Sequence, residues 1–134
     1  MNDLEIKTIS VALKKINYNY IKPQKPDAIR NVNYIDACTI KKVGSDYFEL
    51  TLSREVKLEP KGPFTLDIEF FLYYEYKKTT EDLNIQKYIE ENMAELIENS
   101  PVLSYLSLLI GNITSCSDNT PLISPPILMI EDKK

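Results

Sequence analysis

Two successive runs of the chain alternate apolar and polar side chains with a period of two. In the first run, 47–58, only Arg54 interrupts an apolar set on the even positions: Phe48, Leu50, Leu52, Val56 and Leu58. In the second run, 64–76, the even positions are all apolar or aromatic: Phe64, Leu66, Ile68, Phe70, Leu72, Tyr74 and Tyr76. Alternation over runs of this length indicates long strands with one packed face and one wet face. Pro60-Lys61-Gly62-Pro63 predicts a loop, so the two runs form a hairpin.

The preceding part of the chain predicts two more strands. Leu4 to Tyr20 alternates with a phase slip, which a bulge near Thr8 would reconcile. Residues 22–27 form a loop rich in Pro and Lys, and Tyr34 to Val43 is a further strand that ends at the turn Gly44-Ser45-Asp46. Four strands with short connections favour one antiparallel sheet.

The chain then changes to a helical period. Thr79 and Thr80, followed by acidic residues, predict a helix start. Apolar side chains recur at spacings of three and four, which is typical of an amphipathic helix with one buried stripe: Ile85, Tyr88, Ile89, Met93, Leu96 and Ile97. Asn99-Ser100-Pro101 ends this helix and starts another, because Ser caps well and Pro suits the first helical position.

The second helix, Pro101 to about Ser115, is apolar on nearly all sides. Such a helix is buried on both sides, and a four-stranded sheet covers only one of them. We therefore expect a homo-oligomer whose interface includes Val102, Tyr105, Leu106, Leu109 and Ile113. After the helix, prolines force the apolar tail Pro121 to Ile130 into an extended conformation. The predicted fold is α+β: one domain over 1–134, with a four-stranded antiparallel sheet, a two-segment helix on one face and an extended Pro-rich tail.

Composition narrows the functional classes. The net charge is −4, and no basic cluster exceeds a Lys-Lys pair, so nucleic acid is not an expected partner. The longest apolar stretch, Val102 to Ile113, is too short to span a bilayer, and the first residues do not resemble a signal peptide. Two cysteines, Cys38 and Cys116, are expected to be inert buried thiols. These features predict a cytoplasmic protein that is not inserted in a membrane.

An enzyme is not expected. The chain has no His, which excludes triads with a His base, and its three glycines form no phosphate loop. Asp67 with Glu75-Tyr76-Lys77 loosely resembles the acidic-plus-ExK pattern of some metal-dependent nucleases. Eight residues of strand, however, separate Asp67 from Glu75 by roughly 26 Å, so the two could not share a metal ion. Glu90, Glu91 and Glu95 fit a solvated helix face better than a metal site. We expect no catalytic residue, metal or cofactor.

The order of elements resembles the SecB family of export chaperones. The residues that carry the resemblance are Ser100 to Ile110, Asn112 to Ser115 and Pro121 to Leu128. In that family a Pro opens the long helix, a Tyr follows within a turn, and a short apolar Pro-containing segment returns across the sheet. The resemblance implies a homotetramer, built as a dimer of dimers, that binds unfolded or precursor polypeptides in apolar grooves without a nucleotide. It also implies a client-binding groove wall formed by Leu122, Ile123, Ile127, Leu128 and Met129, with ordinary packing at the edge of the core as the alternative.

Two departures from the family pattern bear on the expected role. Ser104 and Ser107 stand about where the family has a Pro before the Tyr and an Arg after it. The sequence also stops at Lys134, without the further C-terminal helix and extension that engage the SecA motor in typical export chaperones. Coupling to the translocase motor is therefore doubtful, and a protein that guards one dedicated client is as consistent with the sequence as a general export factor.

Phe71 and Tyr73 occupy the otherwise polar face of the second alternating run. They are candidates for client binding, with packing against a loop or a neighbouring subunit as the alternative. Two functions remain open. The first is a holdase-type chaperone for non-native polypeptides, and the alternative is a non-enzymatic, oligomeric interaction or assembly subunit with a single folded partner. Tolerance of unrelated unfolded chains separates the two.

Overall fold

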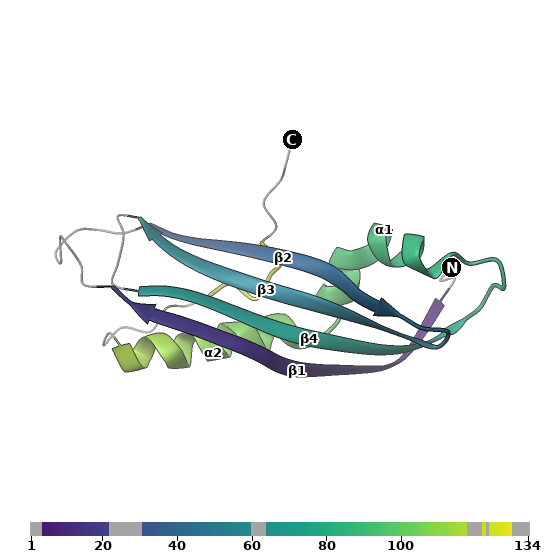
Figure 1. Ribbon diagram of the computed structural model, residues 1–134, viewed down its shortest axis with the longest axis horizontal. Helices are drawn as coiled ribbons and strands as arrows, with labels where there is room; N and C mark the ends of the chain where they lie inside the picture. Colours follow the sequence, from purple (N-terminus) through teal and green to yellow (C-terminus); the bar gives the residue numbers. More distant parts are fainter. Residues whose placement is uncertain (1–3, 22–30, 60–63, 118–121, 123, 130–134) are drawn as a thin grey trace.

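The computed structural model describes residues 4–21, 31–59, 64–117, 122 and 124–129, without the side chains of 116 and 117. The order of the elements is β1 (Leu4–Tyr20), β2 (Asn31–Val43), β3 (Tyr47–Glu59), β4 (Phe64–Lys78), α1 (Ile85–Glu98) and α2 (Val102–Ser117). The strands form one antiparallel sheet in the order β1-β4-β3-β2, and both helices lie on the same face of it (Figure 1). The predicted α+β class and helix placement are confirmed.

The β3–β4 hairpin follows the predicted alternation. Leu50 pairs with Leu72 and Leu52 with Phe70, so the apolar positions of the two strands point to the same face. Every even position of β4 from Phe64 to Tyr76 is buried, because this strand lies inside the sheet and under the helices. The predicted loop, 60–63, lies outside the described residues.

The two edge strands depart slightly from the predicted pattern. The register between β1 and β4 shifts between Ile6 and Thr8, which confirms the bulge expected near Thr8, and shifts again between Leu13 and Lys15. β2 begins at Asn31, three residues before the predicted Tyr34, because its first residues pair with the end of β3. On β1 the inward-facing Leu13, Ile16 and Tyr20 remain 41–66% exposed.

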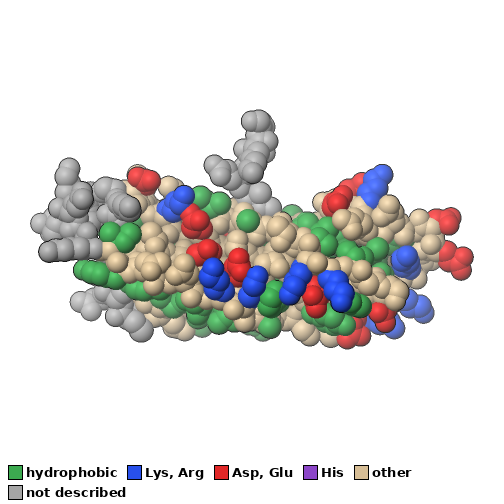
Figure 2. Space-filling view, viewed as in Figure 1, with side chains coloured by type: hydrophobic (Ala, Val, Ile, Leu, Met, Phe, Trp, Pro, Cys, Tyr) green, Lys and Arg blue, Asp and Glu red, His purple; other side chains and the backbone are tan. Residues whose placement is uncertain are grey.

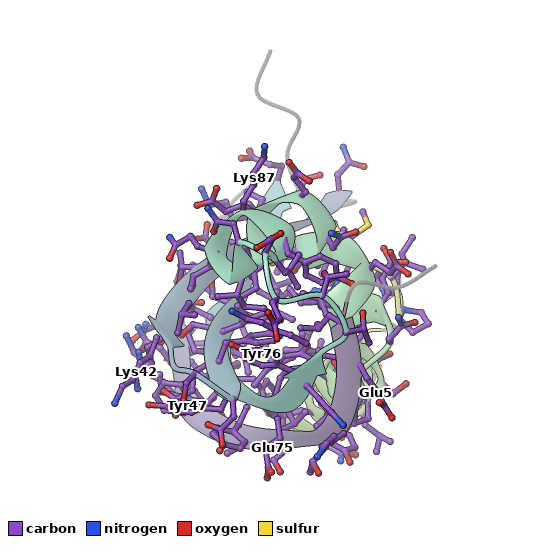
Figure 3. All side chains as sticks on the ribbon, turned by 90° about the vertical axis from the view of Figure 1, so that its right-hand side faces the viewer. Glu5, Lys42, Tyr47, Glu75, Tyr76 and Lys87 are labelled. Carbon is purple, nitrogen blue, oxygen red and sulfur yellow. The ribbon has the colours of Figure 1, made fainter. Side chains whose placement is uncertain are left out.

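The core lies between the inner face of the sheet and the two helices. Figure 3 looks along the strands: the curved sheet encloses Tyr76, while Glu5 and Glu75 point outward and α1 closes the open side. The Tyr74 hydroxyl donates to the carbonyl oxygen of Leu96 at 2.8 Å, and that of Tyr76 donates to Gly44 at 2.9 Å. Large apolar side chains are fully buried at this junction, among them Phe48, Leu50, Leu72, Ile89, Ile97, Leu106 and Ile110.

The start of α1 was predicted at Thr79–Thr80, and this prediction is wrong. β4 continues to Lys78, and 79–82 form the turn that takes the chain off the sheet. The N-cap is Asn84, whose side-chain oxygen accepts a hydrogen bond from the Lys87 backbone N–H at 3.2 Å. α1 is also kinked at Asn92, where φ is −118° and the side-chain amide donates to the Tyr88 carbonyl at 2.8 Å.

α2 begins as the sequence predicts. The Ser100 hydroxyl accepts from the Val102 N–H at 3.3 Å and donates to the Ile97 carbonyl at 2.7 Å, and Pro101 precedes the first residue of the helix. One side of α2 packs on the sheet, and the opposite side carries Ser104, Tyr105, Leu108 and Asn112 at the surface. None of the helices in the described part of the chain has the length and apolar character needed to cross a membrane.

Candidate functional site

The tail after α2 returns across the inner side of the sheet, and we call residues 124–129 the strap. In Figure 1 it is the yellow segment that passes behind β3 and β2. Two hydroxyl groups of α2 hold its beginning. Thr114 Oγ1 accepts from the Leu122 N–H at 2.8 Å, and Ser107 Oγ donates to the Ser124 carbonyl at 2.6 Å. Leu122 and the strap contain neither helix nor strand, and the rest of the predicted extended tail lies outside the described residues.

Under the strap lies a buried ion pair between Asp36 of β2 and Arg54 of β3. The two residues are register partners, and their side chains have no exposed surface. Arg54 Nε donates to Asp36 Oδ1 and Arg54 Nη2 to Asp36 Oδ2, each at 2.7 Å. This bidentate geometry is the strong form of an Arg–carboxylate contact. The pair therefore neutralises both charges inside an apolar sheet face.

Arg54 uses its other donors on the strap. Nη1 donates to Ser124 Oγ at 2.6 Å and to the Pro125 carbonyl at 2.8 Å, and Nη2 donates to the Ile127 carbonyl at 2.6 Å. With the two bonds to Asp36, these contacts occupy the five N–H donors of a guanidinium group. Two of the three strap contacts are to carbonyl oxygens of the main chain.

Asp36 also contacts the main chain of the strap. Its Oδ2 accepts from the Met129 N–H at 2.7 Å, and its own N–H donates to the Met129 carbonyl at 2.8 Å. β2 is an edge strand, so this N–H has no partner strand on its free side. Asp36 and Arg54 together hold an extended segment through its backbone.

Between the strap and α2 lies an open groove of about 510 Å³, which we call the α2 groove. Small polar side chains and apolar groups both line it. Its lining consists of Ser104, Ser107, Leu108, Gly111, Asn112 and Ser115 from α2, with Leu122 and Pro126 from the tail. Leu108 is 66% exposed. A groove of this size and composition suits apolar side chains of an extended peptide.

The groove-wall residues named from the sequence occupy different positions. Ile127 points outward and is 58% exposed, whereas Leu122, Leu128 and Met129 are half-buried. Leu122 and Leu128 pack against the core. Ile123 lies outside the described residues. Ile127 thus lies at the surface and follows Pro126, which lines the α2 groove.

Phe71 and Tyr73 lie on the opposite face of the sheet, where the structure does not bring them near the strap. Lys41 and Lys14 place their Nζ atoms 3.8 Å and 5.1 Å from the centre of the Phe71 ring, and the Tyr73 ring stacks on Tyr47 with centroids 5.6 Å apart. Figure 2 shows this face, with a row of basic and acidic side chains along the length of the sheet. The candidate client-binding residues therefore fall on two faces of the molecule.

The candidate interface residues on α2 also separate into two groups. Val102 and Leu106 are fully buried in the core of the single chain, and Leu109 and Ile113 pack partly against it. Tyr105 is 46% exposed, and the neighbouring Leu108 is more exposed still. Of the five candidates, Tyr105 has the largest surface free for a second subunit.

The ionisable groups give no sign of a metal site in the described part of the chain, where no group of three or more His, Cys, Asp and Glu side chains lies together. Cys38 faces the core, and burial followed by the charge of Asp36 raises the pKa of its thiol to about 12. Cys116 has a side chain outside the described set.

Sequence reasoning did not assign a role to Arg54 or Asp36. A signal for both was present: each is a charged residue on the inward parity of its strand, Arg54 among Leu52 and Val56 and Asp36 between Tyr34 and Cys38. A buried charge requires a partner of opposite sign. Two inward-facing residues of opposite charge on successive strands are therefore candidates for an ion pair with each other.

No protein-family model matches the sequence, and no curated protein matches it. Among solved structures, the chain is similar to the SecB-like chaperone Rv1957 of Mycobacterium tuberculosis, which was solved in complex with a ChAD peptide from the Rv1956 HigA1 antitoxin. The TM-score is 0.65 with 15% sequence identity, and the alignment covers 92% of this chain and 90% of the other. This likeness shows that the chain has the SecB-like fold.

Proposed function

We propose that this protein is a chaperone that holds extended apolar segments of non-native polypeptides in the α2 groove. The observation that carries the proposal is an open groove of about 510 Å³ whose lining includes the exposed Leu108 together with Leu122 and Pro126. A SecB-like neighbour of known structure binds a peptide from its partner protein, which supports a peptide as the ligand class here.

The chemistry of the groove fits a peptide better than a folded surface. Leu108, Leu122 and Pro126 offer apolar contact, while Ser104, Ser107 and Asn112 can hydrogen-bond a peptide backbone. An open groove accepts side chains of different sizes, and covering its exposed apolar groups lowers the free energy of the complex. Binding of this kind needs no nucleotide and no chemical step.

We further propose that the chain works as a homo-oligomer, with a dimer of dimers as the arrangement that the SecB resemblance implies. In the described part of a single subunit, six large apolar side chains are exposed: Leu13, Ile16, Tyr20, Tyr105, Leu108 and Ile127. The three of β1, together with Tyr105 of α2, are candidates for contact with a second subunit. The molecular mass from light scattering, measured at several concentrations, tests this proposal directly.

Binding of an unfolded polypeptide tests the proposed function. Reduced and carboxymethylated α-lactalbumin cannot refold, and the native form of the same protein is the comparison. We expect micromolar or tighter binding to the unfolded form alone. Leu108→Asp should weaken this binding at least tenfold, because it places a charge at the rim of the α2 groove.

Ala37→Asp is the matched control, since Ala37 is exposed on the outer face of β2 and does not line the groove. The oligomer mass of both variants must equal that of the unmodified protein for the comparison to stand. If several unrelated unfolded chains fail to bind, the general holdase function is refuted.

A chaperone with one dedicated client is the second candidate, and the similar structure that holds a peptide from an antitoxin favours it. This candidate predicts tight binding of one natural polypeptide and weak or no binding of unrelated unfolded chains. Competition between α-lactalbumin and the natural client for the same groove separates a general site from a selective one.

A further inference from the structure

The contacts between the strap and the sheet are of a kind that any extended peptide can make. Arg54 binds the carbonyl oxygens of Pro125 and Ile127, and Asp36 binds the N–H and carbonyl of Met129. Ser124 Oγ is the one side-chain atom of the strap in this set of contacts. Recognition of main-chain atoms does not depend on the sequence of the segment bound.

Side-chain packing accounts for only part of what keeps the strap in place. Leu128 is half-buried and packs against the core, whereas Ile127 is 58% exposed and Pro126 is exposed. Ser124 is the fully buried residue of the strap. The strap is also bound by polar contacts from the Asp36–Arg54 pair and from Ser107 of α2.

We propose that the Asp36–Arg54 pair is a backbone-recognition site for an extended client segment, and that the strap occupies this site in the free protein. A bound client takes the place of the strap and presents its own carbonyl and N–H groups to the same donors and acceptors. This inference rests on the proposed chaperone function, because it names the residues that bind the main chain of the client.

The electrostatics of the pair suit this exchange. Asp36 and Arg54 neutralise each other through two hydrogen bonds of 2.7 Å, so the strap contributes only neutral dipoles. A client backbone contributes dipoles of the same kind, whereas a segment that simply left would expose donors and acceptors without partners. Exchange of one backbone for another preserves these hydrogen bonds, and simple dissociation of the strap does not.

Residue-resolved hydrogen exchange of the full-length protein, with and without reduced and carboxymethylated α-lactalbumin, tests the proposal. The Met129 N–H should lose its protection when the client binds, because its acceptor on Asp36 is taken. The Asp36 N–H should stay protected, because a client carbonyl replaces that of Met129. Loss of protection at both amides would mean that the strap only leaves, and it would overturn the proposal.

A substitution in the strap gives a second readout. Ser124→Ala removes the side-chain oxygen with which the strap accepts a hydrogen bond from Arg54. The substitution leaves the Asp36–Arg54 pair unchanged. Because a client must displace the strap, a weaker strap should tighten client binding roughly tenfold. Ser53→Ala is the matched control, since Ser53 precedes Arg54 on β3 and faces the other side of the sheet.

The outcomes separate this inference from the proposed function. If the client binds while the Met129 amide stays protected, the backbone-recognition site is refuted. It is also refuted if Ser124→Ala binds the client no more tightly than the unmodified protein. In either case the α2 groove remains the binding surface. Failure of both the unmodified protein and Ser124→Ala to bind any unfolded chain overturns the chaperone function, and this inference with it.

Discussion

Asp36 and Arg54 are register partners on β2 and β3, and their side chains meet in two hydrogen bonds of 2.7 Å with no exposed surface. The pair lies where the alternation of both strands requires apolar residues. It connects two strands of the sheet to the backbone of a segment more than 70 residues further along the chain than Arg54. One ion pair thus determines where the tail crosses the sheet.

Loss of one partner of this pair should be strongly destabilising. Arg54→Leu leaves the Asp36 carboxylate buried without its counter-charge and also frees the strap, so we expect the free energy of unfolding to fall by about 3–5 kcal/mol. Arg54→Leu combined with Asp36→Leu should cost clearly less than either single substitution, because no charge remains buried. Urea unfolding of the four proteins in the cycle measures this difference. Additive losses would contradict a direct coupling between the two residues.

The sequence predicts the sheet and the helix pair well because these depend on local periodicity. Period-two alternation located β3 and β4, and the phase slip in β1 located its first bulge. The start of α1 was misplaced because Thr79 and Asn84 are both good capping residues, and only the path of the chain off the sheet selects Asn84. Local sequence does not contain that information.

The candidate site was harder to predict because its central contacts are non-local. Which inward-facing charge pairs with Arg54 depends on the register of β2 against β3, and the bonds to the strap involve backbone atoms of residues 125, 127 and 129. Backbone groups leave no signature in the identity of a residue. The resemblance to SecB implies a tail that returns across the sheet, and for residues 124–129 the structure gives the contacts with Asp36 and Arg54.

Gly111 offers a test of the α2 groove that does not disturb the core. Among the described residues, a Cβ at this position would meet only the Leu122 carbonyl oxygen, at an ordinary contact distance of 3.6 Å. Gly111→Ala should therefore stabilise α2 by about 0.5–1 kcal/mol, since Gly costs that much in a helix interior. Gly111→Leu should fill the groove and weaken client binding several-fold, with Gly111→Ala as its control in both urea unfolding and binding. Unchanged affinity with Gly111→Leu would place the client elsewhere.

Asp67 should make the stability of the protein depend on pH. Burial raises the pKa of its carboxyl, and the negative charges of Glu69 and of the cross-strand neighbour Glu55 raise it further. A carboxyl with a raised folded-state pKa favours folding at low pH, and this contribution is lost as the pH rises through that pKa. Asp67→Asn should thus gain about 0.5 kcal/mol at pH 7 and nothing at pH 3. Thermal unfolding at both pH values measures the effect, and an equal gain at pH 3 would assign it to packing.

Cys38 should resist alkylation in the folded protein. Burial and the charge of Asp36 raise the pKa of its thiol to about 12, and the reactive form of a cysteine is the thiolate. At pH 8 iodoacetamide should modify Cys38 on the order of 10³-fold more slowly than an unperturbed thiol. Peptide mass spectrometry distinguishes Cys38 from Cys116, and the same protein in urea provides the reference rate. Rapid modification of folded Cys38 would show that β2 opens on the timescale of the reaction.

Phe71 and Tyr73 allow the outer face of the sheet to be compared with the α2 groove. Lys14 and Lys41 flank the Phe71 ring, and Lys14 also pairs with Glu69 at 3.2 Å, so the aromatic surface is surrounded by charge rather than open. If this surface captures clients, Phe71→Ser with Tyr73→Ser should weaken binding of unfolded α-lactalbumin several-fold at unchanged oligomer mass. If it packs against a second subunit, the same variant should lower the oligomer mass instead. Since cation–π contacts at exposed sites contribute only about 0.5–1 kcal/mol, the fold should survive the double substitution. Unchanged mass together with unchanged affinity would remove both residues from the binding surface and leave the groove beside the strap as the client site.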